Sequence, residues 1–398
     1  MIDPRFAAVA DLLDRFVEED PAYAGQLCVY LDGAPVLDLA VGQDHAPQAG
    51  GFGADDEPPA LRREALTGVF SCSKGAGAVV MGLLVQDGVL DLDARVAEYW
   101  PEYAAAGKEA TTVRQALSHQ AGALGVPGGF SLAEYNESER AAAQLAAAPP
   151  AWRPGITHAY HGLTIGVLME ELVRRTTGES LQQVYEDRVR SPYGIDFYLG
   201  LPEAEEFRYR NVLKPAAAPL PFIDPFGYTG LAFNSTGVFE REDGTAGELL
   251  DLPNHRAVRA GGHSSAGGVA NARGLARLYA VTSTGVVDDA GSRTEPLFSA
   301  ETTRLMTEDQ VFGADRASGE LTAFGIGFMK PAPQNSFGSV WAYGHNGANG
   351  SFGWADPAYG LAFGYVPLRG EDNGNLSRNG ILGAAVRQAR LAATVPRA

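Results

Sequence analysis

The first forty residues predict a helix followed by two strands. Apolar positions recur at helical spacing over residues 1–20, and two β-rich stretches follow at 26–31 and 36–41. The residues between the two stretches, Asp32-Gly33-Ala34-Pro35, are typical of a turn, so the stretches are predicted to pair as a hairpin. Residues 43–65 are rich in Gly, Pro, Asp and Ala and are predicted to form a loop.

The middle of the chain is predicted to be mainly helical, because its apolar residues recur at helical spacing. The predicted helices cover residues 76–87, 93–99, 113–119, 131–148, 163–177 and 271–281. The stretch 201–263 interrupts them with many Pro, Gly and aromatic residues. This composition predicts a long loop that covers a pocket, or alternatively a structural Ω-loop.

Strand-like stretches return near the C-terminus, and a helix ends the chain. The predicted strands are 324–329, 340–344, 351–355 and 361–366, and the last helix covers 381–393. The simplest assembly is an α/β (α+β) fold, in which both chain ends form an antiparallel sheet flanked by helices. We therefore expect one α/β domain from residues 1–75 and 285–398, and an inserted mainly helical domain from residues 76–284.

Composition narrows the classes of function. The 398 residues are 45% hydrophobic and 20% charged, as in a soluble globular protein, and the net charge is −17. This acidic balance disfavours nucleic acid and anionic membranes as partners. The N-terminus lacks the pattern of a secretory signal, the longest apolar run is too short for a bilayer, and the chain has only Cys28 and Cys72. We therefore expect a cytoplasmic protein with no membrane partner.

The strongest chemical signal is an S-x-x-K motif at Ser71 and Lys74, which follows a predicted loop and opens an apolar helix. Residues three apart lie on one face of a helix, so the amine is within reach of the hydroxyl. A buried lysine has a lowered pKa, so its neutral form can accept the serine proton. The helix N-terminus also adds positive potential where an oxyanion develops.

Further motifs follow in a fixed order. Tyr160-His161-Gly162 precedes a predicted helix, and His345-Asn346-Gly347 ends a predicted strand. The segments 117–122 (LSHQAG) and 267–276 (GGVANARGLA) accompany them. Together these motifs resemble those of the serine β-lactamase and penicillin-binding superfamily, specifically the class C-like branch that contains the family VIII carboxylesterases. The resemblance covers nearly the whole chain and implies a β-lactamase-like fold.

The resemblance also implies a role for each matching residue. Ser71 would be the nucleophile that forms an acyl-enzyme, and Lys74 and Tyr160 would share the role of general base. The backbone N–H groups of Ser71 and Ala348 would form the oxyanion hole. Residues that would contact the substrate are His345, Asn346, Gly347 and His161.

Two departures from the family pattern favour an esterase. Gly162 stands where lactamases and peptidases have an asparagine that holds the substrate amide. His345 stands where they usually have a lysine or arginine that attracts a substrate carboxylate. Both losses weaken recognition of an anionic amide, while an ester needs neither anchor. We therefore expect a small-molecule ester as the substrate.

Other functions remain open at this stage. The same fold serves class C-like β-lactamases, D-amino-acid peptidases or amidases, and acyltransferases, and a catalytically silent penicillin-fold binding protein is a further alternative. An α/β-hydrolase is excluded because no serine has glycine two residues before and two residues after it. No cofactor is expected, and no metal, because only His158 and His161 lie close in sequence and neither has a Cys or carboxylate beside it. The sequence does not indicate an oligomeric state.

Overall fold

A computed structural model describes residues 2–45, 58–215, 224, 227–233, 249–288 and 290–392. Its strands are β1 (Gly25–Leu31), β2 (Ala34–Val41), β3 (Thr67–Gly68), β4 (Phe197–Tyr198), β5 (Val269–Ala270), β6 (Val311–Ala314), β7 (Leu321–Phe324), β8 (Tyr343–Asn346), β9 (Phe352–Asp356) and β10 (Leu361–Pro367). Its α-helices are α1 (Ala7–Glu19), α2 (Cys72–Gln86), α3 (Val96–Tyr99), α4 (Val113–Leu117), α5 (Leu132–Asn136), α6 (Ser138–Ala147), α7 (Thr164–Thr177), α8 (Leu181–Tyr185), α9 (Tyr228–Phe233), α10 (Arg256–Gly261), α11 (Ala272–Ser283), α12 (Ala300–Thr307) and α13 (Arg378–Ala392).

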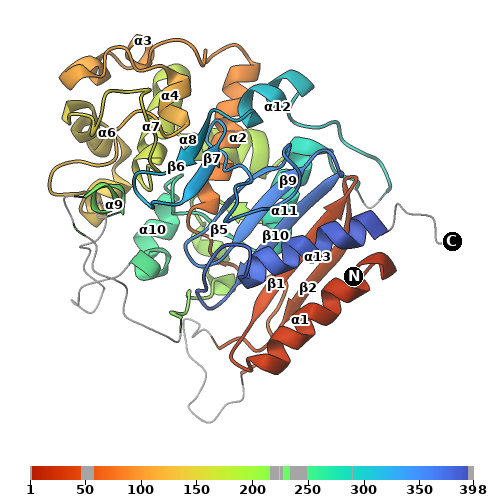
Figure 1. Cartoon of the computed structure of the whole chain (residues 1–398). Coiled ribbons are helices and arrows are strands. Elements are labelled where there is room, and N and C mark those ends of the chain that lie inside the picture. The colour runs from red at the N-terminus through yellow and green to blue at the C-terminus, as the bar shows by residue number, and fades with distance from the viewer. Residues whose placement is uncertain are drawn as a thin grey trace.

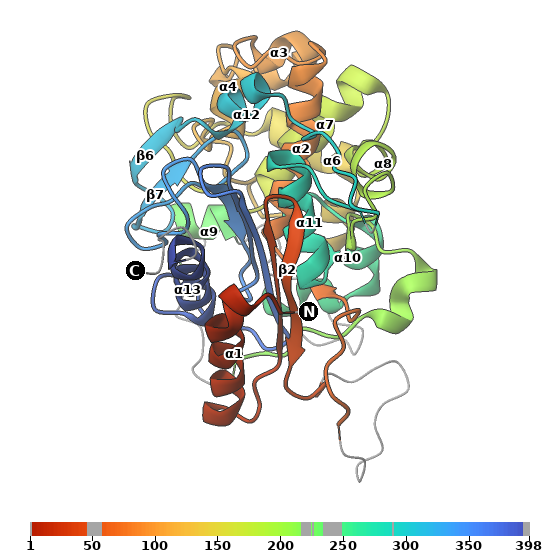
Figure 2. The same ribbon diagram turned by 90° about the vertical axis from the view of Figure 1, so that its right-hand side faces the viewer.

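The main sheet has five strands in the order β2-β1-β10-β9-β8, and every neighbouring pair is antiparallel. Strands from the two chain ends therefore form one sheet, which confirms the predicted fold class (Figure 1). Helices α1 and α13 cover one face of the sheet, and α11 with the rest of the helical part lies on the other (Figure 2). The domain division at residues 75 and 285 remains a prediction.

Strand β1 shows why the sheet is buried on both faces. Successive side chains of a strand point to opposite faces. Leu27 and Val29 belong to the apolar core beneath α1 and α13, whereas Cys28 and Tyr30 belong to the core shared with α2, α7 and α11. At the turn into β2, Asp32 and Gly33 both have positive φ, of 48° and 79°, as a tight hairpin turn requires.

Helix α2 is the central helix of the molecule. Each residue from Cys72 to Leu84 is buried, and the helix carries alanine, glycine and large apolar residues on all sides. A helix that is apolar all round belongs in the interior of a large protein. Its N-terminus at Ser71 is consequently fixed by packing on every side.

Three of the differences from the predicted elements have a clear local cause. The predicted helix 131–148 is two helices, because Glu137 has φ −103° and ψ 82° and breaks the run between α5 and α6. The predicted strand 324–329 lies earlier, as β7, because Gly325 and Gly327 follow it in a turn in which Gly327 has φ 70°. The predicted strand 340–344 begins later, as β8, because Val340 and Trp341 are exposed.

The stretch 201–263 is more ordered than a loop where the structure describes it. It contains α9 and α10 and two short 3₁₀-helices, Glu203–Arg208 and Leu249–Asn254. Residues 216–223, 225–226 and 234–248 of the predicted loop lie outside the described residues, as does most of the predicted loop 43–65. Among the helices that are described, none has the length and apolar character needed to cross a membrane.

Candidate active site

Ser71 sits at the N-terminus of α2 on a strained turn. Phe70, directly before it, has φ 46°, a conformation that few residues other than glycine adopt. Ser71 is the N-cap residue and remains half-buried, whereas the helix that follows is buried. The turn therefore holds the Ser71 hydroxyl at the edge of the core, where a substrate can reach it.

Lys74 is fully buried and points at Ser71. Its Nζ lies 2.9 Å from Ser71 Oγ and 2.7 Å from each of two carbonyl oxygens, those of Gly162 and Ser265. Burial holds the pKa of Lys74 well below its usual value. A neutral amine has two N–H groups and one lone pair. With both N–H groups donated to the carbonyls, the lone pair is directed at the Ser71 hydroxyl.

The carbonyl of Ser265 is held by a buried polar network. The Ser265 hydroxyl lies 2.9 Å from His263 Nδ1 and 3.1 Å from the Tyr135 hydroxyl. Glu170 of α7 accepts a hydrogen bond from the backbone N–H of Ser264 at 2.7 Å. The segment that orients Lys74 is thus tied to both α5 and α7. No motif in the sequence indicates this network, because its members are far apart in the chain.

Tyr160 lies beside the same pair. Its hydroxyl interacts with the Ser71 side chain, which partly lowers the pKa of the phenol, and Lys74 Nζ lies 4.9 Å from the centre of its ring. Burial raises the pKa of Tyr160 despite this interaction with Ser71. The phenol consequently keeps its proton at neutral pH. Its backbone N–H donates to Asp315 Oδ2 at 2.9 Å, which fixes this part of the chain against the turn after β6.

His345, in the third motif, faces the Tyr160 ring from β8, with 5.9 Å between the ring centres. His345 Nδ1 donates to the carbonyl oxygen of Asn346 at 2.8 Å, while the buried Nε2 has no partner within the described residues. Burial first, and then the nearby Lys74, lower the pKa of His345 to about 3. The imidazole is therefore neutral and does not replace the cation of an anion-binding site.

Two backbone N–H groups are free to form an oxyanion hole. In the described part of the chain, neither Ser71 N–H nor Ala348 N–H donates to another group. The two donors are held together because the Asn349 side chain donates to the carbonyl of Gly68 at 3.1 Å. Gly347 is equally close to this segment: a Cβ there would lie 2.4 Å from the carbonyl oxygen of Val69, so only glycine fits.

The remaining predicted site residues lie in different surroundings. The side chain of Asn346 lines a pocket next to β8, described below. His161 is fully buried, and its ring packs on His119 and Trp152 rather than on Ser71 or Lys74. The thiol of Cys72 is also fully buried, which raises its pKa and removes it as a second nucleophile.

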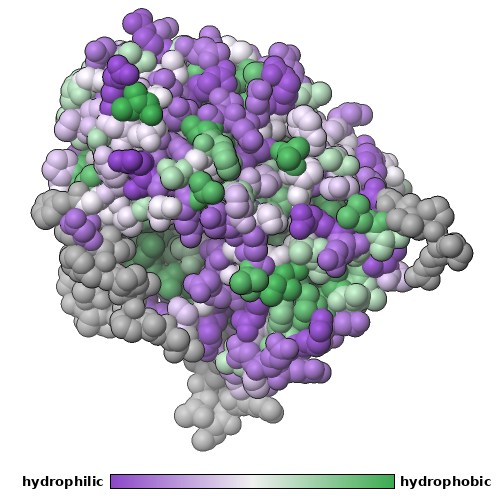
Figure 3. Space-filling view, viewed as in Figure 1, coloured by the Kyte–Doolittle hydropathy of each residue, from purple (hydrophilic) through white to green (hydrophobic). Residues whose placement is uncertain are grey.

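Gly162 is covered by α9. A Cβ on Gly162 would lie 2.8 Å from the carbonyl oxygen of Ala232 and 2.9 Å from the ring of Phe233. The Phe233 ring centre is also 5.8 Å from that of Tyr160. This wall is apolar, and Figure 3 shows a recess with apolar residues in its wall in the area where α9 and α10 are drawn in Figure 1. Phe222 and Phe226, two further aromatic residues of the stretch 201–263, lie outside the described residues.

The arrangement combines a hydroxyl, a desolvated amine, a protonated phenol and two free N–H donors. These are the components of a serine nucleophile with its base, a proton donor and an oxyanion hole. Within the ranges that the structure describes, no three His, Cys, Asp or Glu side chains are grouped as metal ligands would be. The chemistry that these residues support is acyl transfer through Ser71.

Comparison with known proteins shows the family of this chain. The family model described as Beta-lactamase matches residues 9–386. The chain is 33% identical over 380 residues to the esterase/beta-lactamase LipL of Mycobacterium tuberculosis, a match that covers 92% of this chain and 82% of LipL.

Solved structures extend the comparison. EstA from Arthrobacter nitroguajacolicus Rue61a is 47% identical, with a TM-score of 0.90 over 99% of both chains. A family VIII carboxylesterase is 30% identical, with a TM-score of 0.81 over 98% of both chains. Similarity at this level extends over the sheet and the helical part alike.

Proposed function

Because this chain belongs to the Beta-lactamase family and its relatives include a family VIII carboxylesterase, we propose that it hydrolyses small carboxylic esters through an acyl-enzyme on Ser71. The protein is a serine hydrolase of the carboxylesterase type. The observation that carries the assignment of residues is the position of Lys74 Nζ, 2.9 Å from Ser71 Oγ and fixed by two carbonyl oxygens.

Acylation begins when Ser71 Oγ attacks the ester carbonyl carbon and its proton passes to the lone pair of Lys74. The carbonyl oxygen gains the negative charge and is stabilised by Ser71 N–H and Ala348 N–H. Removing one such donor typically costs about 3–4 kcal/mol of transition-state stabilisation. The alkoxide then leaves with a proton from Tyr160, and Tyr160 recovers a proton from the Lys74 ammonium. Water repeats the sequence on the acyl-enzyme and releases the acid.

The pKa of Lys74 is lowered and that of Tyr160 is raised, and these opposite shifts make Lys74 the base and Tyr160 the acid. Burial lowers the pKa of Lys74, so its amine is neutral and can accept the Ser71 proton. Tyr160 is a weak acid kept protonated by burial, so it donates to the leaving group. Its ring lies close enough to the amine to stabilise the ammonium that forms during the reaction.

The walls of the site favour an ester over a β-lactam or a peptide. At position 162, α9 occupies the space that an amide-bearing side chain would need. On β8, His345 is neutral and offers no positive charge to a carboxylate. His345, Asn346 and Gly347 would line the substrate on this side, and the buried His161 would act indirectly, through its contacts with His119 and Trp152.

The alternative functions differ in the substrate that acylates Ser71 and in the nucleophile that removes the acyl group. A D-amino-acid amidase and EstCE1, a hydrolase with promiscuous acyltransferase activity, are each 18% identical to this chain. Identity at this level shows a shared fold and nothing more. The name of LipL joins esterase and beta-lactamase. A class C-like β-lactamase, a D-amino-acid peptidase or amidase and an acyltransferase therefore remain second candidates, and a silent binding protein the third.

Labelling by a fluorophosphonate tests the enzyme assignment. The probe should bond to Ser71, as mass spectrometry of the labelled peptide would show, and Ser71→Ala should abolish both labelling and hydrolysis of p-nitrophenyl butyrate. Ser73→Ala is the matched control: Ser73 Oγ bonds the carbonyl of Phe70 and the N–H of Gly268, so its loss should cost stability and leave labelling intact. Labelling that survives Ser71→Ala would contradict the assignment.

We also propose that the protein resides in the cytoplasm. Cys28 and Cys72 are both free and buried, which suits a reducing compartment. Fractionation of cells that express the natural gene would test this location, and recovery of the protein from the periplasm or the medium would contradict it.

A further inference from the structure

A small polar pocket adjoins the third motif. Its volume is about 100 Å³, and it lies between β7, the segment after Met329 and residues 373–374. Two residues connect it to the reactive centre. Asn346 follows His345 on β8, and Asn373 Nδ2 donates to the carbonyl of Gly347 at 2.9 Å, directly before the predicted oxyanion donor Ala348. These two residues connect the pocket to the segment that carries the predicted oxyanion donor.

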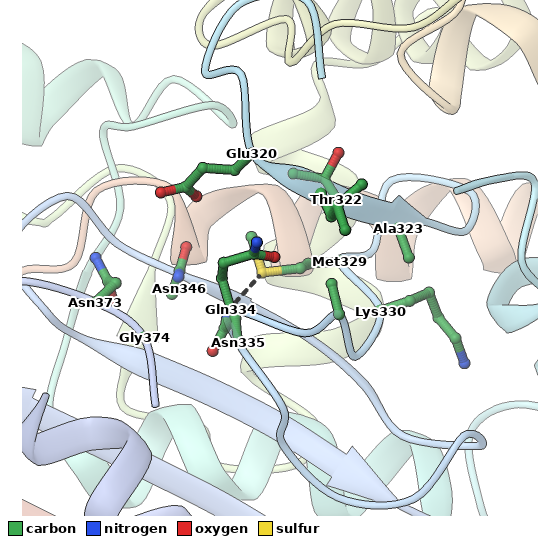
Figure 4. Close-up of a pocket in the computed structure, with 12 residues that line it drawn as sticks. Glu320, Thr322, Ala323, Met329, Lys330, Gln334, Asn335, Asn346, Asn373 and Gly374 are labelled. Carbon is green, nitrogen blue, oxygen red and sulfur yellow. Dashed lines mark hydrogen bonds between the residues drawn. The ribbon is translucent and has the colours of Figure 1, made fainter. Parts of the chain in front are cut away.

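Polar side chains with unused hydrogen-bonding capacity converge on this pocket (Figure 4). The carboxylate of Glu320 and the amides of Gln334 and Asn346 line it, and none of the three makes a hydrogen bond or ion pair within the described residues. Pockets that bind small molecules are typically concave and contain a few such convergent polar groups. The free donors and acceptors here can serve a ligand.

The charges of the pocket exclude an anionic ligand. The one cationic side chain in its lining is Lys330, and Figure 4 shows that side chain turned away from the other polar groups. Its Nζ donates to the carbonyl of Val340 at 3.0 Å. Glu320 would repel a carboxylate or a phosphate. The amides and the carboxylate instead match hydroxyl groups, which donate and accept hydrogen bonds without charge.

Thr322, Asn335 and Asn373 add further polar groups to the lining, and part of the rest is apolar and suits the carbon side of such a ligand. Ala323, Met329 and Ala332 supply this surface. A cavity of about 100 Å³ has room for a glycerol-sized group rather than an oligosaccharide. On the other side of the site, the Phe233 wall is apolar and suits a hydrocarbon acyl chain.

We propose that this pocket binds the alcohol part of the ester and that the alcohol is an uncharged polyol of about three carbons, such as glycerol. The inference rests on the proposed esterase function and names its substrate class. The hydroxyl groups of the alcohol would donate to Glu320 and exchange hydrogen bonds with Gln334 and Asn346.

Matched butyrate esters test the proposal on the full-length protein. Glyceryl 1-monobutyrate and n-propyl butyrate share the acyl group and the three-carbon alcohol, and they differ in two hydroxyl groups. We expect kcat/KM to be at least about tenfold higher for the glyceryl ester, mainly through KM, as one or two net hydrogen bonds would give. Glu320 and Gln334 are exposed at the rim of the pocket. Glu320→Ala and Gln334→Ala should each reduce this preference at least about threefold. Glu301→Ala, the same change on the exposed surface of α12, should keep it.

Different results would contradict the proposed alcohol pocket and the proposed esterase function. The intrinsic difference in reactivity between the two esters is the same for every variant. A change in the ratio of their kcat/KM values between variants therefore reports the pocket alone. No preference in the wild-type protein, or a preference that both rim variants retain, would overturn the proposal. Faster hydrolysis of butyrylcholine than of the glyceryl ester would overturn the uncharged assignment. Failure to hydrolyse even p-nitrophenyl butyrate would overturn the esterase function, and the subsite with it.

Discussion

The ring of Phe233 occupies the space that a side chain on Gly162 would need, since a Cβ at position 162 would lie 2.9 Å from that ring. The two residues are 71 positions apart, and they meet because α9 packs over the segment before α7. The absence of an amide at position 162 is therefore built into the packing of the site, and a substitution at this one position cannot restore it.

Introducing the family's usual amide should damage the site. Gly162→Asn must displace Phe233 or the backbone at Ala232, so we expect kcat/KM for p-nitrophenyl butyrate to fall at least about tenfold, with no gain in nitrocefin hydrolysis. Adding Phe233→Ala should recover part of the loss by making room. A single Gly162→Asn variant that keeps its esterase activity and hydrolyses nitrocefin would contradict this account.

Lys74 and Tyr160 should act on one proton path. Lys74→Ala and Tyr160→Phe should each lower kcat by roughly 10² or more, the usual range for a positioned acid or base. Their effects should not add in the double variant, because each residue needs the other to complete the transfer. Kinetics of the two single variants and the double variant decide the point, and full additivity would indicate independent roles.

The pH dependence of kcat/KM follows from the two shifted groups. Lys74 must be neutral, and its pKa is lowered, so activity should be present above that lowered pKa and lost as the pH falls through it. Tyr160 must be protonated, and its pKa is raised, so activity should persist to at least about pH 10, the ordinary tyrosine value. Since burial lowers the pKa of His161 to about 4 and contributes most to lowering that of His345 to about 3, neither ring causes a limb near pH 6. A pH–rate profile measured with p-nitrophenyl acetate would show a loss of activity near pH 8 on the alkaline side if this account were wrong.

Ser265 should position the base without touching the substrate. Ser265→Ala keeps the carbonyl that holds Lys74 but removes the hydroxyl between Tyr135 and His263. We expect kcat to fall about tenfold with little change in KM, and the acid limb to move to higher pH, because a less confined Lys74 regains part of its ordinary pKa.

Ser264→Ala is the control for this change. Ser264 is equally buried, and its hydroxyl donates only a long bond, 3.4 Å, to the carbonyl of Gly166. Both substitutions alter packing to the same extent, so a purely structural role of Ser265 would lower the melting temperatures of both variants and shift neither pH profile.

The sequence predicted those features of the site that local spacing determines. Ser71 and Lys74 are one helical turn apart, so their contact follows from the S-x-x-K spacing once a helix begins there. The hairpin of β1 and β2 follows from alternation and turn residues in the same way. The order of the predicted elements also indicated one sheet with strands from both chain ends, and the observed strand order confirms this fold class.

Features that depend on distant contacts were not predictable. The Tyr135, Glu170, His263 and Ser265 network brings together side chains from separate segments, each of an ordinary residue type. The position of β8 was predicted too early, because Val340 and Trp341 have strand-like side chains but lie exposed before the strand begins. The stretch 201–263 was predicted as a loop from its Pro and Gly content, although tertiary packing forms α9 over Gly162.

A comparison of two substrates tests the central claim, that this site is built for esters. The purified protein should hydrolyse p-nitrophenyl acetate with a kcat/KM at least about 10³-fold above that for nitrocefin, which corresponds to roughly 4 kcal/mol of transition-state stabilisation. The expected gap arises because Phe233 fills the place of the amide anchor and because neutral His345 offers no charge to the nitrocefin carboxylate. Equal rates for the two substrates would contradict the esterase account and favour a β-lactamase.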